Sequence, residues 1–512
     1  PSLPVFTQAS ATDNISNVTL TFVDVKTSSN CEGSYSITRT WTATDDCGNS
    51  SQASQTINVE DKTAPTFNGL PSAEITANCN SIPNPASVTA TDNCDASVSV
   101  NFEELSNTVT NGCGQIIRKW TATDSCGNTN SFTQTINVVD LIAPTFTAPA
   151  NIIISKDENC TANTTPSFTG NVSNVSDNCD VNPIVSYSDK DCFGTEKRAT
   201  LNAGNGSYFY FNISGLDSNL PASAIKNLTL SFETNQGKGR AEFTLVAPNG
   251  QAIILVGSYC EGGNCDDGNS STYEIYSPSF YPASSGYTKW DNSANIPQGS
   301  GNFQPNGSLS SINSTYISGL TGYVSKFEDF TGTMNGQWFI FSRKNSNVNG
   351  NIRFNSVCLT PAIGLCESNE LIIRHWTATD YCGNISTANQ LIQVVDNTKP
   401  IISTNAENNK DLGCNPTVLA PVFTLTEACS PGQIAITTDG PTSEGCSYSQ
   451  TWKANFTDAC GNIADEKVIT YTWTVDLTKP VINTTAVSGD KGCNPTVLAP
   501  VFTLTEACSP GQ

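Results

Sequence analysis

Apolar and polar residues alternate along several short segments of the chain, such as residues 56–59, 135–138 and 391–394. An alternation with a period of two is typical of a β-strand that buries one face. Turns rich in Asn, Gly and Pro separate these segments, and no apolar run approaches the ~20 residues of a membrane-spanning helix. The pattern predicts an all-β protein with no membrane insertion in this segment.

One motif recurs along the chain and defines a repeat. The segment from Trp41 to Asn49 reads WTATDDCGN, and versions of it begin at Trp120, Trp376 and, more loosely, Trp452. A strand-like stretch follows each copy and ends in an Asp and then a Pro, at Pro65, Pro144, Pro400 and Pro480. These prolines lie 79, 256 and 80 residues apart, so the third repeat contains an insertion of about one further domain.

The period near 79 residues and the short strands predict tandem immunoglobulin-like β-sandwiches, with each Trp in a core. The boundaries follow from the motif: repeats at 1–64 (truncated at its N-terminal side), 65–143, 144–186 with 362–399, and 400–479, the insert at 187–361, and the start of a further repeat at 480–512. Residues 413–433 and 492–512 are identical, so we expect a longer array that continues covalently into further repeats.

Twenty cysteines occur beside a single His and a single Met, with no CxxC pair, which indicates disulfides and an extracellular location. The first repeat has Ile15 in place of the second cysteine, which favours pairing of first with second and third with fourth inside each repeat. Sequence alone leaves the connectivity open. We expect Cys192–Cys358 and Cys260–Cys265 in the insert. The expected disulfide cysteines of the repeats are Cys31, Cys47, Cys79, Cys94, Cys113, Cys126, Cys160, Cys179, Cys366, Cys382, Cys414, Cys429, Cys446 and Cys460.

The formal charge of −22 argues against nucleic acid as a partner, because a phosphate-binding surface concentrates Lys and Arg. Catalysis is not expected either. The only histidine, His375, is replaced by Thr40, Lys119 and Thr451 in the other repeats, and a Ser-His-Asp or Cys-His arrangement needs a histidine base.

Acidic residues recur at the ends of the repeats. Asp61, Asp140, Asp396 and Asp476 each lie just before the proline that ends a repeat, and Asp13, Asp92 and Asp177 recur in a T/S-D-N loop. Calcium prefers such carboxylate oxygens, so we expect it as the cofactor, bound by the four junction aspartates. The alternative is that these residues cap turns and keep the array soluble.

The repeated Trp-Thr-Ala-Thr-Asp-x-Cys-Gly-Asn motif and the following Val-x-Asp-x-x-x-Pro resemble hyalin-repeat-like (HYR-like) domains with four cysteines. Such domains are stacked in giant cell-surface adhesins of Bacteroidetes, including the SprB-type gliding adhesins. The resemblance covers about 335 of the 512 residues. It implies an extracellular stalk exported by type IX secretion.

The insert has motifs of another kind, at Phe243–Gly250, Asn335–Phe341 and Gly350–Phe354. They resemble the P/Homo B domain, which implies a jelly-roll β-sandwich. The family's calcium-binding aspartate has no counterpart, because the corresponding stretch reads Ser342-Arg343-Lys344. Several aromatic residues would form a platform for sugar rings, or else cover the insert's own core: Tyr273, Tyr276, Tyr281, Tyr287 and Trp290.

These observations predict a segment of a giant repetitive extracellular adhesin. Its repeats would form a stalk and its insert would bind a surface glycan or polysaccharide, for attachment or gliding motility. One alternative is the non-catalytic accessory region of a secreted enzyme. The other is a eukaryotic extracellular matrix protein made of hyalin repeats.

Overall fold

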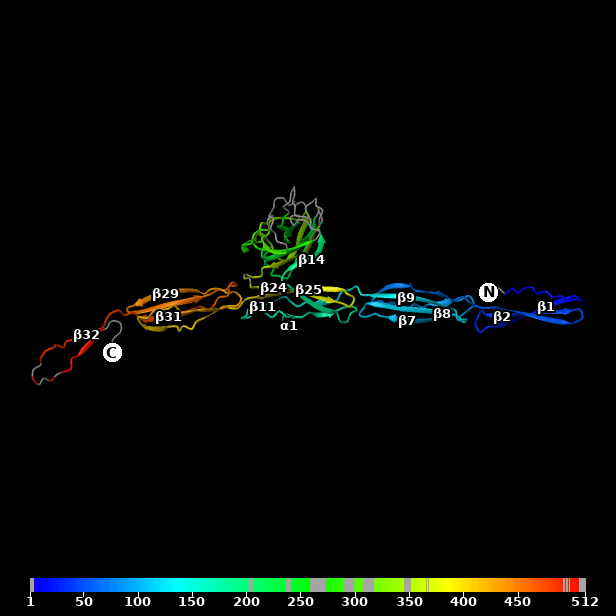
Figure 1. Cartoon of the computed structure of the whole chain (residues 1–512), viewed down its shortest axis with the longest axis horizontal. Helices are drawn as coiled ribbons and strands as arrows, with labels where there is room; N and C mark the ends of the chain where they lie inside the picture. Colours follow the sequence, from blue (N-terminus) through cyan, green and yellow to red (C-terminus); the bar gives the residue numbers. More distant parts are fainter. Residues whose placement is uncertain are drawn as a thin grey trace. The chain divides into compact units, whose positions relative to one another are not determined.

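The computed structural model describes residues 4–201, 206–235, 241–257, 273–289, 299–306, 317–344, 351–364, 366, 368–490, 493, 496 and 498–505. These residues form almost only β-strands, interrupted by the one-turn helix α1 (Pro166–Thr169) and the 3₁₀ turns η2 (Ala283–Ser285) and η3 (Phe327–Asp329) (Figure 1). The all-β prediction is confirmed, with tandem β-sandwich domains and several disulfides. Among the described residues no helix has the length and apolarity that crossing a membrane requires.

The chain divides into two compact units. The first comprises Pro1–Thr147, Val172–Ser186 and Trp376–Ala388, and the second comprises Ala148–Asn171, Tyr187–His375 and Asn389–Gln512.

The first two repeats lie in the first unit. The first repeat is an antiparallel sheet of β1 (Val18–Ser28), β2 (Tyr35–Asp45) and β3 (Ser50–Val59). In the second repeat, a four-stranded sheet in the order β5-β9-β8-β7 accompanies the pair β4-β6. The bounds are β4 Thr66–Asn68, β5 Glu74–Asn78, β6 Thr89–Thr91, β7 Ser99–Asn107, β8 Gly114–Thr123 and β9 Thr129–Val139.

The same arrangement of one four-stranded sheet and one strand pair returns in the later repeats. The third repeat has the sheet β11-β25-β24-β13 and the pair β10-β12, and the fourth has β27-β31-β30-β29 and β26-β28. A last pair, β32-β33, follows. The bounds are β10 Thr145–Thr147, β11 Ile152–Ser155, β12 Ser173–Ser176, β13 Ile184–Lys190, β24 Glu370–Thr379, β25 Ile385–Val395, β26 Ile401–Ser403, β27 Lys410–Cys414, β28 Thr424–Thr426, β29 Ala435–Glu444, β30 Ser447–Asn455, β31 Lys467–Thr474, β32 Val481–Thr484 and β33 Phe502–Thr505.

The motif Trp lies on the second-to-last strand of each four-stranded sheet and faces the core. Trp120, Trp376 and Trp452 are buried, because strand alternation places every second residue of β8, β24 and β30 on the inner face. Trp120 packs against Phe102 and Phe132, with ring centroids 5.2 and 6.2 Å away.

The insert consists of two five-stranded sheets, β14-β23-β16-β19-β20 and β15-β22-β17-β18-β21. Their inner faces share one large core that includes Phe232, Phe243, Phe280 and Trp338. The bounds are β14 Phe193–Thr200, β15 Ser207–Ile213, β16 Ile225–Thr234, β17 Ala241–Val246, β18 Gln251–Val256, β19 Glu274–Phe280, β20 Gly299–Phe303, β21 Gly322–Tyr323, β22 Gly336–Lys344 and β23 Ile352–Pro361. The boundary expected at residue 187 falls inside β13, which belongs to the sheet of the third repeat.

The insert packs on the third repeat through an apolar patch. Leu371 and Ile373 of β24 and Leu391 of β25 belong to the same buried cluster as the insert's core. In the second repeat the positions of Leu371 and Leu391 are the polar Gln115 and Thr135. Comparing the repeats with one another would therefore have located this contact surface, because only the repeat that carries the insert needs leucine there.

Candidate functional site

The disulfides join neighbouring repeats, and the predicted pairing inside each repeat is wrong. The first cysteine of one repeat pairs with the second cysteine of the next, and the third pairs with the fourth of the next. The pairs are Cys31–Cys126, Cys79–Cys179, Cys113–Cys382, Cys160–Cys429 and Cys366–Cys460.

Strand length explains why the third and fourth cysteines of a repeat do not pair. Cys113 directly precedes the ten-residue strand β8, and Cys126 follows that strand. Ten extended residues span roughly 33 Å, whereas bridged Cα atoms lie about 4.4–6.8 Å apart. Across the junction the Cα atoms of Cys113 and Cys382 are 5.7 Å apart, which a disulfide can bridge.

The remaining cysteines fall into three groups. Cys192 and Cys358 pair inside the insert, as expected, and Cys446 is also disulfide-bonded. Cys47, Cys94 and Cys414 are free thiols, contrary to expectation, and so is Cys493. The pair expected between Cys260 and Cys265 lies outside the described residues.

The side chain of the last Asn in the repeat motif makes a hydrogen bond to the preceding repeat. The side-chain amide of Asn128 donates to the backbone carbonyl of Asp61 at 3.1 Å, and Asn384 and Asn462 do the same to Asp140 and Asp396 at 3.0 and 3.1 Å. Each Asn is held by the Asp four residues earlier in its own motif, as Asn128 is by Asp124.

A glycine before the third cysteine lets the repeats approach closely. Gly112 has φ +90°, and a Cβ there would lie 2.6 Å from Cβ of Cys179 in the next repeat. In the first repeat, Gly33 follows the third cysteine, Cys31, but like Gly112 it lies eight residues before the motif Trp, and a Cβ there would meet Cβ of Cys94. Any larger residue would strain the backbone and displace the facing cysteine.

Carboxylates from both sides of a junction meet beside these disulfides. At the junction of the second and third repeats, Oδ1 of Asp140 accepts hydrogen bonds from the Ile142 backbone and the Asn178 side chain. Oδ1 of Asp177 accepts from the backbone of Cys179 and Asp180. The second oxygen of each, Oδ2, is buried without a hydrogen-bond partner.

Equivalent carboxylates meet at the other two described junctions. Asp61 and Asp92 bring carboxylate oxygens within 4.8 Å of each other, and the Oδ2 atoms of both are buried without a partner. At the next junction Asp396 meets Glu427, which replaces the loop aspartate and binds the same two backbone N–H groups with Oε1. Asp476, the fourth expected metal residue, binds Thr478 through Oδ1 and exchanges two hydrogen bonds with Asn415.

These donors fit a hard cation and not a soft metal. The sulfur atoms of Cys79 and Cys179 are close to Asp140 but belong to a disulfide, so they are not thiolate ligands. Burial raises the pKa of the Cys94 thiol, and the negative charges of Asp61 and Asp92 raise it further, so it stays protonated. Oxygen atoms remain as the donors, the set that calcium and magnesium prefer.

Asp177 stays ionised at this junction. Burial favours its neutral form, but hydrogen bonds from the backbone N–H groups of Asp180 and Cys179 oppose burial and keep the pKa of Asp177 below its ordinary value.

The aromatic residues of the insert do not form one platform. Tyr276 is 4% exposed, belongs to the core and bonds Glu274, so its expected role in ligand binding is wrong. Tyr273 packs under the guanidinium of Arg353. Tyr281 and Tyr287 do lie together, with ring centroids 4.9 Å apart and Tyr287 39% exposed. Trp290 lies outside the described residues.

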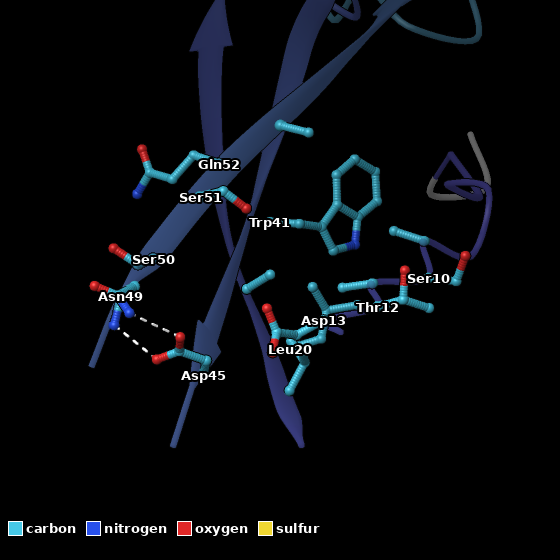
Figure 2. Close-up of a pocket in the computed structure, with 15 residues that line it drawn as sticks. Ser10, Thr12, Asp13, Leu20, Trp41, Asp45, Asn49, Ser50, Ser51 and Gln52 are labelled. Atoms are coloured by element: carbon cyan, nitrogen blue, oxygen red, sulfur yellow. Dashed lines mark hydrogen bonds between the residues drawn. The ribbon is translucent and has the colours of Figure 1, made fainter. Parts of the chain in front are cut away.

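A pocket of about 410 Å³ in the first repeat contains the motif Trp41, which is only half-buried there (Figure 2). Its rim is polar, with Asp13 on one side and Asn49, bonded to Asp45, on the other. In the later repeats the equivalent Trp is buried in the core. The pocket therefore lies where the other repeats have a closed core.

The single histidine, His375, contacts an amide on the neighbouring strand. Nδ1 of His375 lies 2.7 Å from the amide oxygen of Asn389 on the neighbouring strand, at the edge of a pocket of about 390 Å³ that also holds the Cys192–Cys358 disulfide. A disulfide sulfur is not a nucleophile.

Comparisons with known proteins give a family for one repeat. No curated protein matches the chain. Among solved structures, protocadherin gammaB7 EC3-6 in a cis-dimer has 11% identity and a TM-score of 0.24 over 90% of this chain and 94% of that one. Mouse cadherin-23 EC22-24 has 9% identity and a TM-score of 0.22 over 81% and 99%, and Drosophila N-cadherin EC1-4 has 10% identity and 0.18 over 91% and 94%. Within the second repeat, residues 69–138 match the HYR-like domain with 4 cysteines.

Proposed function

We propose that this chain is a tension-bearing stalk segment of an extracellular adhesin, in which disulfides between repeats limit extension and the insert is presented to a ligand. The observation that supports the proposal is the disulfide register. It gives two covalent paths along the array that are far shorter than the polypeptide.

We call the first covalent path the Trp-strand path. It runs through the disulfides Cys31–Cys126, Cys113–Cys382 and Cys366–Cys460. Between them it uses only the 14 residues from Cys113 to Cys126 and the 17 from Cys366 to Cys382, which contain β8 and β24. At about 3.3–3.6 Å per residue these segments extend to roughly 100 Å. Without disulfides, the chain from Cys31 to Cys460 would extend to roughly 1,500 Å.

We call the second covalent path the loop path. It runs through the disulfides Cys79–Cys179 and Cys160–Cys429. It uses only the 20 residues from Cys160 to Cys179. Neither path enters the insert, so a pull along the array does not have to pass through residues 187–361. The insert can therefore bind, open or be cut without loss of covalent continuity.

The same proposal includes the fold class of each domain and the ligand of the insert. We assign the repeats to the immunoglobulin-like class and the insert to the jelly-roll class, in keeping with their sheet pairs. Cys47, Cys94 and Cys414 are free here, although the corresponding cysteines pair with a neighbouring repeat elsewhere in the chain. The candidate partner is a surface glycan or polysaccharide, for attachment or gliding motility, and Tyr281 with Tyr287 is the aromatic pair that would meet it.

A cleavage experiment tests the connectivity. A protease site is placed at Gly286, a turn where an added Cβ meets no atom within 4 Å, in a chain that also carries Cys192→Ser and Cys358→Ser. After cleavage, the register above keeps both fragments in one band on a non-reducing denaturing gel. Pairing inside each repeat would instead release two bands without reductant and would overturn the proposal.

Force measurement tests the function itself. The oxidised chain, pulled from attachment points near Cys31 and Cys460, should extend to no more than roughly 100 Å plus the disulfides. The same chain in reductant should extend to roughly 1,500 Å. Equal extension in both states would show that the disulfides do not limit extension.

A further inference from the structure

We propose that each described junction between repeats binds one divalent cation of the calcium class between its two facing carboxylates. The pairs are Asp61 with Asp92, Asp140 with Asp177, and Asp396 with Glu427. The inference goes beyond the stalk function and does not depend on it.

The pair at the second junction gives the clearest evidence. Asp140 is 3% exposed, and its Oδ2 is buried with no hydrogen-bond partner. Across the junction, Asn178 donates its side-chain amide to Oδ1 of Asp140 at 3.1 Å, and Oδ2 of the adjacent Asp177 is also buried without a partner. Buried polar atoms in folded proteins are almost always paired, so two facing orphan oxygens point to a group that lies between them.

The surrounding hydrogen bonds orient these oxygens and leave them free. Backbone N–H groups of its own loop donate to Oδ1 of Asp140 and to Oδ1 of Asp177, which fixes each carboxylate and leaves its second oxygen without a donor. Within the described part of the chain, no ion pair between side chains involves any of the six carboxylates. Like charges held together without a cation repel.

The recurrence of the pair also favours a cation. Where the fourth repeat lacks the loop aspartate, Glu427 supplies a carboxylate that binds the N–H groups of Cys429 and Ser430 with one oxygen. A turn cap alone would be served by Asn or Ser as well, whereas a cation site requires the charge. Calcium fits better than magnesium because it accepts irregular oxygen shells completed by water.

Calcium titration of the full oxidised chain tests the proposal, with calorimetry and thermal unfolding as readouts. Calcium should bind in the range of about 0.1–1 mM typical of extracellular modules and should raise the melting temperature. Asp140→Asn and Asp177→Asn should each remove one bound calcium, and magnesium should bind more weakly. Asp46→Asn, at an exposed position in the first repeat, is the matched control and should bind as the native chain does.

Two outcomes would overturn the inference. If calcium at about ten times that concentration neither binds nor raises the melting temperature, and Asp140→Asn is as stable as the native chain, the two carboxylates share a proton instead. If Asp140→Asn and Asp177→Asn bind as many calcium ions as the native chain, the ions lie elsewhere. The cleavage experiment above is independent of both results, because it reports only cysteine connectivity.

Discussion

Asn384 donates its side-chain amide to the backbone carbonyl of Asp140 at 3.0 Å, across the boundary between the third and second repeats. The carboxylate Oδ1 of the same Asp140 accepts a hydrogen bond from the Asn178 side chain of the third repeat at 3.1 Å. One residue at the end of a repeat therefore meets the next repeat twice, through its backbone and through its side chain, beside the disulfide Cys79–Cys179. Hydrogen bonds, a disulfide and two carboxylates thus lie together at the junction between the second and third repeats.

Replacing Asn384 by Ala should weaken this junction. The change removes the hydrogen bond to Asp140 and leaves a buried carbonyl without that donor, which typically costs about 1–3 kcal/mol. Asn49→Ala is the matched control, because Asn49 makes the same contacts to its own motif Asp45. Chemical unfolding should show a larger loss for Asn384→Ala. Equal losses would mean that the bond between repeats adds nothing.

Gly112→Ala should disturb the same junction more strongly than a glycine change elsewhere. Both Gly112 and Gly48 have φ near +90°, so alanine is strained at either position. Only at Gly112 does the new methyl group meet a neighbour, Cβ of Cys179 at 2.6 Å. We expect slower or incomplete formation of Cys79–Cys179, measured by thiol labelling during oxidative refolding. Equal labelling of both variants would contradict the close approach.

Trp120→Ala should destabilise its repeat by about 3–5 kcal/mol, as expected for truncation of a buried aromatic side chain. Trp120 is 2% exposed and packs against Phe102 and Phe132. Trp41→Ala should cost clearly less, because Trp41 borders an open pocket. Denaturant unfolding followed by the remaining tryptophans would compare the two. A larger loss at Trp41 would contradict the difference in burial.

Acid should weaken the loop around Asp95 in the second repeat. Hydrogen bonds from the backbone of Ser97 and then Ser125 hold the pKa of Asp95 below its ordinary value of 3.8. A lowered pKa in the folded state stabilises the protein above the unfolded value, and this contribution is lost as the pH falls through the folded pKa. The stability difference between the native chain and Asp95→Asn should therefore shrink below about pH 4. A gap that widens on acidification would reverse the sign of this argument.

Much of the fold follows from local sequence. Alternation in segments such as 135–138 predicted strands that the structure contains, and the motif tryptophans of three repeats are buried as expected. These features depend on which face of a strand a side chain occupies, and the period of two in the sequence determines that. The insert was also visible as a change of motif, and its strand composition as a set of short apolar runs.

The contact surface between the insert and the third repeat could be predicted in part from the sequence. Leu371 and Leu391 stand where the second repeat has Gln115 and Thr135, so comparison of the repeats contains the signal. The burial of Tyr276 was not accessible in this way, because an aromatic residue at a strand position serves a core or a surface equally well.

The sequence by itself determined an all-β repeat array with many disulfides. It also identified the junction aspartates as candidate calcium ligands. Only the tertiary structure decided which cysteines pair between repeats and which carboxylates meet at the described junctions. Cys113 and Cys126 are close in sequence but lie at opposite ends of an extended strand, whereas Cys382, 269 residues from Cys113, lies within bonding distance. A disulfide or a pair of carboxylates depends on separations of a few ångströms in space, and strand alternation carries no information about which repeat end will face which.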